Sequence, residues 1–268
     1  MDGVGLTSLW VAAMRAVESE RGADALVRDP FARELAGEKG FDILERGKPS
    51  DVPVIPIRTK WIDDIFAATK LEQIVVLAAG MDARAFRLDT LAGKKLFEVD
   101  RGFVLAYKRA HVAAKPKCDR VEVPIDLRDD WPSALANAGF DAKRPALFLV
   151  EGLLVYLEEA SVRSIFARVD ALSATGSEIV FESNNRALLS SPIMAARVAF
   201  VRELGAPWIF GVDDPKTLLP STWSSTVEDF ADVGARLGRW PFPPIPKDAP
   251  AEMLAAVPRS FLVHATKL

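Results

Sequence analysis

The segment at residues 73–100 has the pattern of a strand, a tight turn, a helix and a second strand that ends in an acid. Residues 74–77 form a short apolar run rich in β-branched side chains, typical of a strand buried on both faces of a parallel sheet. The next three residues, Ala-Ala-Gly at 78–80, allow the backbone to turn sharply. Asp100 follows Gly80 by 20 residues, the spacing at which an acid commonly accepts hydrogen bonds from ribose hydroxyls.

The glycine content of the turn bears on which nucleoside is bound. A dinucleotide site usually has the pattern G-x-G-x-x-G, so that the backbone approaches a pyrophosphate at a helix N-terminus. Here the turn has one glycine, and the acidic Asp82 stands where phosphate charge would arrive. A nucleoside without phosphate fits better, and S-adenosylmethionine is the common one with a positive centre. The same residues also suit an ordinary strand-to-helix turn with an aspartate ending the next strand.

Further patterned segments follow one another over residues 6–185: SLWVAAMRAVESERG from 8, DPFARELAG from 29, IRTKWIDDI from 57, LAAGMDARAFRLD from 77, FEVD from 97, IDLRDDW from 125 and EGLLVYL from 151. In this order they resemble the motifs of S-adenosylmethionine-dependent methyltransferases of the leucine carboxyl methyltransferase family. The similarity is greatest to its bacterial branch, which includes polyketide O-methyltransferases. The ordered set is far more specific than any single segment.

The resemblance implies roles for individual residues in binding S-adenosylmethionine. Arg58 resembles the arginine that pairs with the methionine carboxylate of the cofactor. Arg15 resembles an N-terminal basic residue that closes over the same end. Ala78 and Gly80 would line the cofactor, and Asp100 would bind its ribose.

The same resemblance extends to the later strand ends. Asp126 and Leu127 would flank the adenine, and Glu151 would lie beneath the cofactor at the end of the fourth strand. Tyr156, within EGLLVYL, either faces the acceptor or packs under the following helix with its hydroxyl bonded locally. The family's usual G-A-G turn has alanine as its first residue here, Ala78, which either weakens cofactor binding or shifts the turn.

Strand and helix patterns alternate after Asp100, with strands expected at 121–125, 146–150 and 179–182 and helices at 102–114, 131–138 and 159–173. Such alternation implies an α/β fold with a doubly wound parallel sheet. Together with the resemblance, it predicts a Rossmann-like class I methyltransferase sheet, mostly parallel with an antiparallel C-terminal strand. Ligands of such sheets bind at the carboxyl ends of the strands, where Asp100, Asp126 and Glu151 lie.

At 268 residues, half of them hydrophobic, the chain can bury a sizeable core, and its simplest organisation is a single methyltransferase domain, 1–268. We divide it into an N-terminal helical lid (1–70), a cofactor-binding core (71–185), an inserted helical cap or acceptor region (186–222) and C-terminal strands (223–268). A last strand is expected over 259–266, and proline-rich connectors over 49–56 and 241–250.

Three helices are expected in the lid, at 6–17, at 29–35 with an end at Gly37, and at 57–70. The apolar stripe of the first helix suits either core packing or a lid over the cofactor. Residues 186–222 break the alternation, and either form an acceptor pocket or only pack on the sheet. The acceptor-pocket interpretation rests on the large apolar side chains in and next to this segment, Met194, Phe200, Trp208, Phe210 and Trp223.

Composition excludes several classes of function. The net charge of −3 and the absence of a basic block disfavour a nucleic-acid partner. Cys118 is the only cysteine, so no internal disulfide or cysteine-based zinc site can form, and no metal site is predicted. The apolar run at 146–157 is interrupted by Glu151 and is too short to span a membrane. With no basic cluster before the first apolar stretch, we expect a cytoplasmic protein; the oligomeric state stays open.

The chemistry of the methyl acceptor is less defined. The two histidines, His111 and His264, are expected in a helix and in the last strand, and neither is well placed as a base. Their placement favours a carboxylate or an acidic phenol on a small molecule. Three hypotheses result: an O-methyltransferase, a protein that binds S-adenosylmethionine without turning it over, and a nicotinamide-dependent dehydrogenase, which the single glycine disfavours.

Overall fold

Seven strands form one sheet in the computed structural model, which describes residues 3–47, 53–242, 246 and 249–268. In sheet order they are β3 (Asp119–Pro124), β2 (Lys95–Asp100), β1 (Gln73–Leu77), β4 (Ala146–Val150), β5 (Glu178–Asn184), β7 (Ser260–Lys267) and β6 (Trp223–Asp229). Strands β1 to β5 pair in parallel, and β7 is antiparallel to both of its neighbours. The mostly parallel sheet with an antiparallel C-terminal strand is confirmed.

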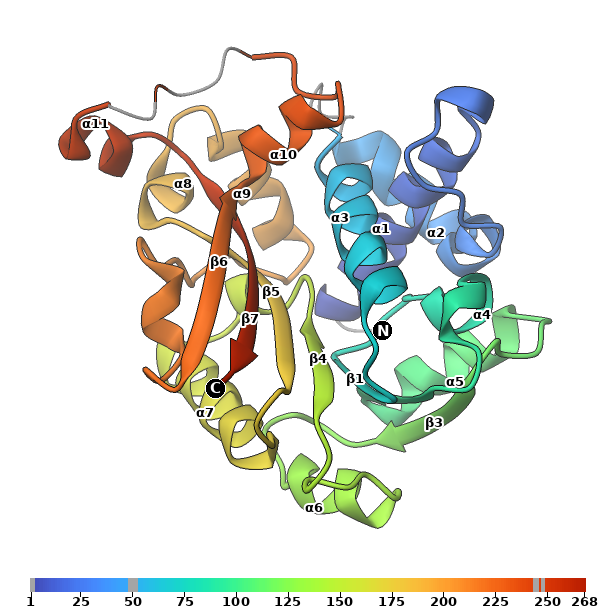
Figure 1. The fold of residues 1–268 in the computed structure, drawn as a ribbon. Coiled ribbons are helices and arrows are strands. Elements are labelled where there is room, and N and C mark those ends of the chain that lie inside the picture. Colours follow the sequence, from blue (N-terminus) through green and yellow to red (C-terminus); the bar gives the residue numbers. More distant parts are fainter. Residues whose placement is uncertain (1–2, 48–52, 243–245, 247–248) are drawn as a thin grey trace.

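Helices cover both faces of this sheet (Figure 1). One face packs against α3 (Val54–Ala68), α5 (Gly102–His111) and α10 (Phe230–Arg236), and the other against α6 (Trp131–Asn137) and α7 (Glu159–Leu172). In β1 the side chains of Ile74 and Val76 enter the first of these cores, and those of Val75 and Leu77 enter the second. The sheet is therefore doubly wound, as predicted.

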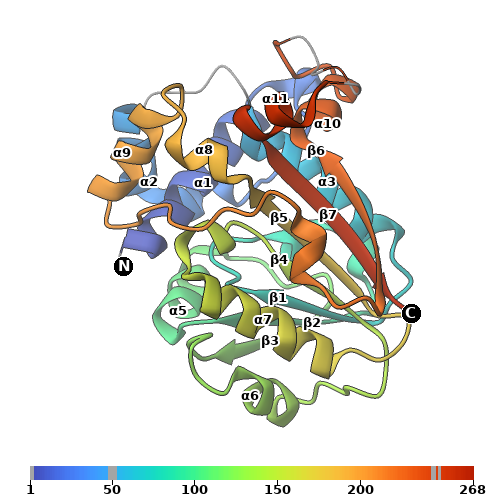
Figure 2. The same cartoon turned by 90° about the vertical axis from the view of Figure 1, so that its left-hand side faces the viewer.

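Two additions to the sheet meet each other above it. Helices α1 (Gly3–Ser19) and α2 (Ala32–Gly47) come from the N-terminus, and α8 (Arg186–Ser190) and α9 (Ala195–Glu203) follow β5. Figure 2 shows α9 beside α1 and α2. A small separate core of Trp10, Ile43, Val201 and Leu204 joins α1, α2 and α9. The predicted lid and the predicted cap thus share one set of buried side chains.

Several helix boundaries differ from the prediction. Gly37 does interrupt the second helix, with φ 56° and ψ −177°, but the chain resumes as a helix and continues to Gly47. Helix α3 begins at Val54, three residues before the expected start. The predicted connectors at 49–56 and 241–250 lie partly outside the described residues. No described helix is both long enough and apolar enough to cross a bilayer.

The remaining short elements connect the larger ones. They are the helix α4 (Arg84–Arg87), the helix α11 (Ala251–Ala256) and the 3-10 turns η1 (Gly22–Asp24), η2 (Asp89–Leu91), η3 (Leu154–Tyr156) and η4 (Pro215–Leu218). Helix α4 is only one turn long, so the unit between β1 and β2 has little helix. The turn after β1, rather than a long helix, therefore makes up the wall of any site at this edge.

The conformation of Gly37 gives a prediction about stability. A β-carbon on Gly37 would be strained at its positive φ and would lie 3.2 Å from the Tyr107 hydroxyl. We expect Gly37→Ala to lower the free energy of unfolding by about 1–3 kcal/mol, measured by urea denaturation. The exposed neighbour Glu38 serves as the control, because Glu38→Ala should change the same quantity by less than about 0.5 kcal/mol. Equal effects of the two substitutions would contradict the assignment of strain to Gly37.

Candidate functional site

The turn after β1 has two residues in the left-handed region of φ. Ala78 has φ 54° and Gly80 has φ 45°, and Ala78 is the one non-glycine residue with positive φ in the described part of the chain. The turn is tied to the neighbouring strand, because the Ala79 amide donates to the Val99 carbonyl at 3.3 Å. A β-carbon at Gly80 would lie 3.3 Å from the Ser8 β-carbon, so α1 packs closely over this turn. The turn keeps a conformation suited to glycine even with alanine in its first position.

Asp100, the last residue of β2, faces this turn. Its Oδ2 accepts from the Gly80 amide and its Oδ1 from the Arg101 amide, both at 2.7 Å. Burial raises the pKa of Asp100, and the two amide hydrogen bonds oppose that rise. Because a carboxylate can accept about four hydrogen bonds, each oxygen keeps capacity for a further donor such as a ribose hydroxyl.

Asp82 occupies the place where a pyrophosphate would bind in a dinucleotide site. Its Oδ1 accepts from the Arg84 amide at 2.7 Å, at the beginning of the one-turn helix α4. Its Oδ2 accepts from Arg84 Nη1 at 2.5 Å. The chain's own carboxylate therefore takes the amide that a phosphate would need, which disfavours a dinucleotide.

Asp126 and Leu127 lie just after β3, at the rim of the same sheet edge. The Asp126 carboxylate accepts from Arg128 Nε at 2.9 Å and from Nη2 at 2.8 Å. These side-chain hydrogen bonds lower the pKa of Asp126 to about 2. Asp126 is the most exposed of the predicted acids, with 24% of its side chain accessible. It is therefore ionised throughout the ordinary pH range.

Glu151, directly after β4, lies between two guanidinium groups. Its Oε1 accepts from Arg58 Nε at 2.8 Å, and its Oε2 accepts from Arg84 Nη1 at 2.7 Å. Burial favours the neutral acid, but the charges of Arg84 and Arg58 hold the pKa of Glu151 below its ordinary value. Arg84 also donates to Asp63 of α3 at 2.7 Å. The pairs connect the end of β4 with α3 and with the turn after β1.

Arg58 projects from α3 and has two carboxylate partners. Besides Glu151, its Nη1 donates to Glu182 Oε1 at 2.5 Å. Its Nη2 lies near Gly152, where a β-carbon would be 3.6 Å away, and donates to no described residue. Arg58 is thus fixed by two ion pairs while one terminal nitrogen stays available for another carboxylate.

Arg15 is more firmly bound than the sequence suggested. Its Nε donates to Asp29 at 3.1 Å and its Nη2 to the Met81 carbonyl at 2.5 Å. Both contacts are buried, and Met81 belongs to the turn after β1. In this structure Arg15 connects α1 to that turn and to the start of the second helical segment.

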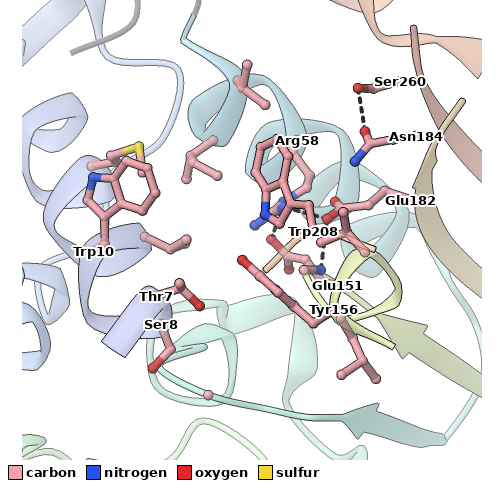
Figure 3. A pocket seen from close by; sticks show the side chains of 18 of the residues that line it. Thr7, Ser8, Trp10, Arg58, Glu151, Tyr156, Glu182, Asn184, Trp208 and Ser260 are labelled. Atoms are coloured by element: carbon pink, nitrogen blue, oxygen red, sulfur yellow. Dashed lines mark hydrogen bonds and ion pairs between the residues drawn. The ribbon is translucent and has the colours of Figure 1, made fainter. Parts of the chain in front are cut away.

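One cavity of about 2170 Å³ lies at the carboxyl ends of the parallel strands and includes every site residue predicted from the sequence: Arg15, Arg58, Ala78, Gly80, Asp100, Asp126, Leu127, Glu151 and Tyr156. Figure 3 shows part of this cavity, with Trp10 across from Tyr156 and Glu182. The Tyr156 hydroxyl donates to no described residue. The interpretation in which Tyr156 packs under the following helix with a locally bonded hydroxyl therefore has no such hydrogen bond among the described residues.

The cap residues divide between the cavity and the core. Met194, Phe200 and Trp208 line the cavity. Phe210 and Trp223 were expected beside them, but both pack into the core between the sheet and α7. Trp223 is the first residue of β6, and the alternation of side chains along that strand places its ring on the face that packs against α7.

Sequence reasoning missed several polar residues of the cavity wall, and three of them lie at the ends of β5 and β7. They are Glu182 and Asn184 of β5 and Ser260 of β7. Asp100, Asp126 and Glu151 were selected because they lie at the carboxyl ends of predicted strands. Glu182 is the last residue of the strand expected at 179–182, so the same criterion would have selected it.

Residues 8–170 match the sequence profile of the leucine carboxyl methyltransferase family, which is more than half of the chain. The chain belongs to this family. The similarity found in the ordered motifs of the sequence is therefore confirmed.

Relatives of this leucine carboxyl methyltransferase family member match two thirds or more of its length. A Streptomyces coelicolor protein is 36% identical over 96% of both chains, and a Rhodococcus jostii protein is 37% identical over 100% of this chain and 97% of its own. A Mycobacteroides abscessus protein is 46% identical over 68% of this chain but 64% of its own length. All three are provisionally named S-adenosyl-L-methionine-dependent methyltransferases. This family member is accordingly an S-adenosyl-L-methionine-dependent methyltransferase.

Solved structures share the fold. A DUF574 family protein from Streptomyces avermitilis superposes with a TM-score of 0.63 at 14% identity, over 98% of this chain and 97% of its own. A protein from Thermobifida fusca, provisionally named a methyltransferase, superposes with a TM-score of 0.62 at 17% identity, over 88% of this chain and 92% of its own. The Rossmann-like methyltransferase sheet is thus confirmed by structure as well as by sequence.

The residues of the cavity fit S-adenosylmethionine. Asp100 offers carboxylate oxygens to a ribose, and Arg58 Nη2 offers a donor to a carboxylate. Asp82, whose two oxygens accept from Arg84, occupies the amide that a phosphate would need. A ligand with two hydroxyls and a carboxylate meets these groups, whereas a pyrophosphate does not.

The left-handed conformation of Ala78 gives a second stability prediction. Glycine has no steric cost at φ 54°, so we expect Ala78→Gly to raise the free energy of unfolding by about 0.5–1 kcal/mol in urea denaturation. Ala79 is the matched control, because it is buried and has no positive φ. Ala79→Gly should lower the same free energy by about 0.5–1 kcal/mol or more. A loss of stability in Ala78→Gly of the same size would show that Ala78 is unstrained.

Proposed function

We propose that this methyltransferase transfers the methyl group to an oxygen, a carboxylate or hydroxyl, of a small molecule. The observation that supports a small-molecule acceptor is the extent of the cavity. It continues past the predicted cofactor residues to the ends of β5 and β7 and under α9, with a volume of about 2170 Å³. A pocket for one ligand typically has about 300–1,000 Å³, so this cavity has space for a second molecule beside the cofactor. The family description, leucine carboxyl methyltransferase, names an oxygen acceptor and supports the same class of reaction.

The proposed cofactor residues follow the order of the strands. Asp126 and Leu127 at β3 would hold the adenine, and Asp100 at β2 would accept from the ribose. Ala78 and Gly80 at β1 would line the centre of the cofactor.

The other end of the cofactor would meet the ion pairs. Arg58 Nη2 would donate to the methionine carboxylate, and Glu151, fixed by two guanidinium groups, would lie beneath it. For Arg15 we propose a positioning role, since its contacts to Asp29 and the Met81 carbonyl fix α1 over the turn.

When bound, S-adenosylmethionine supplies an electrophilic methyl group on its sulfonium. The chain itself must then place the acceptor oxygen in line with that methyl group and exclude water. The shared core of α1, α2 and α9 provides the wall that closes over the cavity. Preorganised ion pairs at the strand ends keep the cofactor's position fixed during transfer.

The Asp100 role is tested by replacing its charge while keeping its shape. We expect Asp100→Asn to weaken S-adenosylmethionine binding by about 1.5–3 kcal/mol in calorimetry, because charge-assisted hydrogen bonds to the ribose are lost. Asp130, an exposed residue that caps α6, is the control, and Asp130→Asn should bind as the parent does. Parent-like affinity in Asp100→Asn would remove Asp100 from the ribose site.

The Arg58 role is tested by comparing two ligands. Arg58→Ala should weaken binding of S-adenosylmethionine by about 1.5–3 kcal/mol, while adenosine, which lacks the amino-acid tail, should lose much less. Arg163→Ala, at an exposed arginine of α7 paired with Glu159, is the control and should leave both affinities unchanged. Equal losses for the two ligands would contradict a contact between Arg58 and the carboxylate.

The function as a whole is tested by calorimetry followed by an acceptor screen. We expect S-adenosylmethionine and S-adenosylhomocysteine to bind and NAD not to bind. Release of S-adenosylhomocysteine with a panel of small carboxylic acids and hydroxyl compounds then reports transfer. Binding without transfer to any member would favour a protein that only holds the cofactor, and tight NAD binding would favour the dehydrogenase hypothesis.

A further inference from the structure

Glu182 and Asn184 form a polar edge at the end of β5. They are two residues apart in a strand, so both side chains project to the face that carries α3. Asn184 pairs in register with Ser260 of β7, and the Ser260 hydroxyl donates to Asn184 Oδ1 at 2.7 Å. Figure 3 marks this bond with a dashed line. It orients the Asn184 amide nitrogen away from Ser260, and that nitrogen donates to no described residue.

The two oxygens of Glu182 have different surroundings. Oε1 accepts from Arg58 Nη1 at 2.5 Å and from the Gly152 amide at 2.8 Å. Oε2 is buried and has no hydrogen-bond partner among the residues that the structure describes. A buried polar atom without a partner costs free energy, and Glu182 lines the cavity, so a donor on a ligand would remove that cost. Burial also raises the pKa of Glu182 against the opposing charge of Arg58, which strengthens this carboxylate as a base.

The wall near this edge is aromatic. Trp208 is held beside Tyr156, because the Ile209 and Phe210 amides donate to the Val155 carbonyl at 2.8 and 3.1 Å. Across the cavity from this edge, Trp10 and Phe200 lie edge to face with ring centroids 5.3 Å apart. Flat apolar rings fit such a wall better than flexible polar chains do.

Resting on the proposed function, we propose that Glu182 and Asn184 form the acceptor subsite, and that the acceptor is a hydroxyl group on a planar apolar ring. The hydroxyl donates to Glu182 Oε2, and the Asn184 amide donates to a neighbouring oxygen of the same molecule. A carboxylate acceptor would instead bring a second negative charge against Oε2. Of the two acceptors that the sequence favoured, the structure supports the phenol.

The chemistry of this subsite balances without a further reactant. Glu182 Oε2 takes the proton of the hydroxyl while the oxygen forms its bond to the methyl carbon. The bond between that carbon and sulfur breaks, and its electron pair stays on sulfur, giving a methyl ether and neutral S-adenosylhomocysteine. The protonated Glu182 returns its proton to water when the product leaves.

The test measures binding of three matched probes to the protein saturated with S-adenosylhomocysteine: 2-naphthol, 2-naphthoate and 2-(aminomethyl)naphthalene. We expect the parent to bind 2-naphthol about ten- to hundredfold more tightly than 2-naphthoate. Glu182→Gln should abolish or reverse this preference, because the amide cannot accept as a carboxylate does. With S-adenosylmethionine, Glu182→Gln should lower the turnover of 2-naphthol by about 10²–10⁴-fold.

The control is Glu178→Gln, at the other end of β5, where the carboxylate pairs with His264 at 3.0 Å and lies outside the cavity. It should behave as the parent with every probe. Tighter binding of 2-naphthoate, failure of 2-naphthol to bind, or an unchanged preference in Glu182→Gln would overturn the subsite while leaving the methyltransferase function intact. Preference for the amine would overturn the oxygen acceptor itself, and failure of S-adenosylhomocysteine to bind would show that the proposed function is wrong.

Discussion

The structure depends on the buried ion pairs around Glu151. A carboxylate at the end of a buried strand is costly unless charged partners and hydrogen bonds surround it. Arg58 and Arg84 supply both, and Arg84 in turn bonds to Asp63 of α3 and to Asp82 of the turn after β1. Loss of either guanidinium would remove one of the two positive charges that compensate the buried Glu151 carboxylate. The same pairs therefore stabilise the fold and shape the cavity.

The residues of the cavity that could be predicted from the sequence are mainly acids at the ends of strands. The positions of Asp100, Asp126 and Glu151 followed from hydrophobic strand patterns and from the rule that ligands of parallel sheets bind at carboxyl ends. Local sequence decides these features, because each strand and the acid that follows it are contiguous. The ordered motifs added the family, which no single turn or acid could have identified.

Contacts between residues that are far apart in the sequence could not be predicted from local sequence patterns. Arg84 and Glu151 are 67 residues apart, and Arg58 and Glu182 are 124 apart, so no local pattern reveals either pair. The second half of α2 was missed because Gly37 is a strong helix terminator, yet here it only redirects the helix. Trp223 was misplaced because an aromatic side chain fits a core as well as a pocket, and only the register of β6 decides between them.

The packing of α1 has a consequence for the order of events in the cavity. Its Ser8 lies over Gly80 at the cofactor end, while its Trp10 contacts Phe200 of α9 at the other end. A displacement of this one helix therefore alters both binding regions together. If either ligand favours one position of α1, the two affinities become thermodynamically linked, and each ligand must change the affinity for the other by the same factor. Any cooperativity between cofactor binding and acceptor binding would then arise from the position of helix α1.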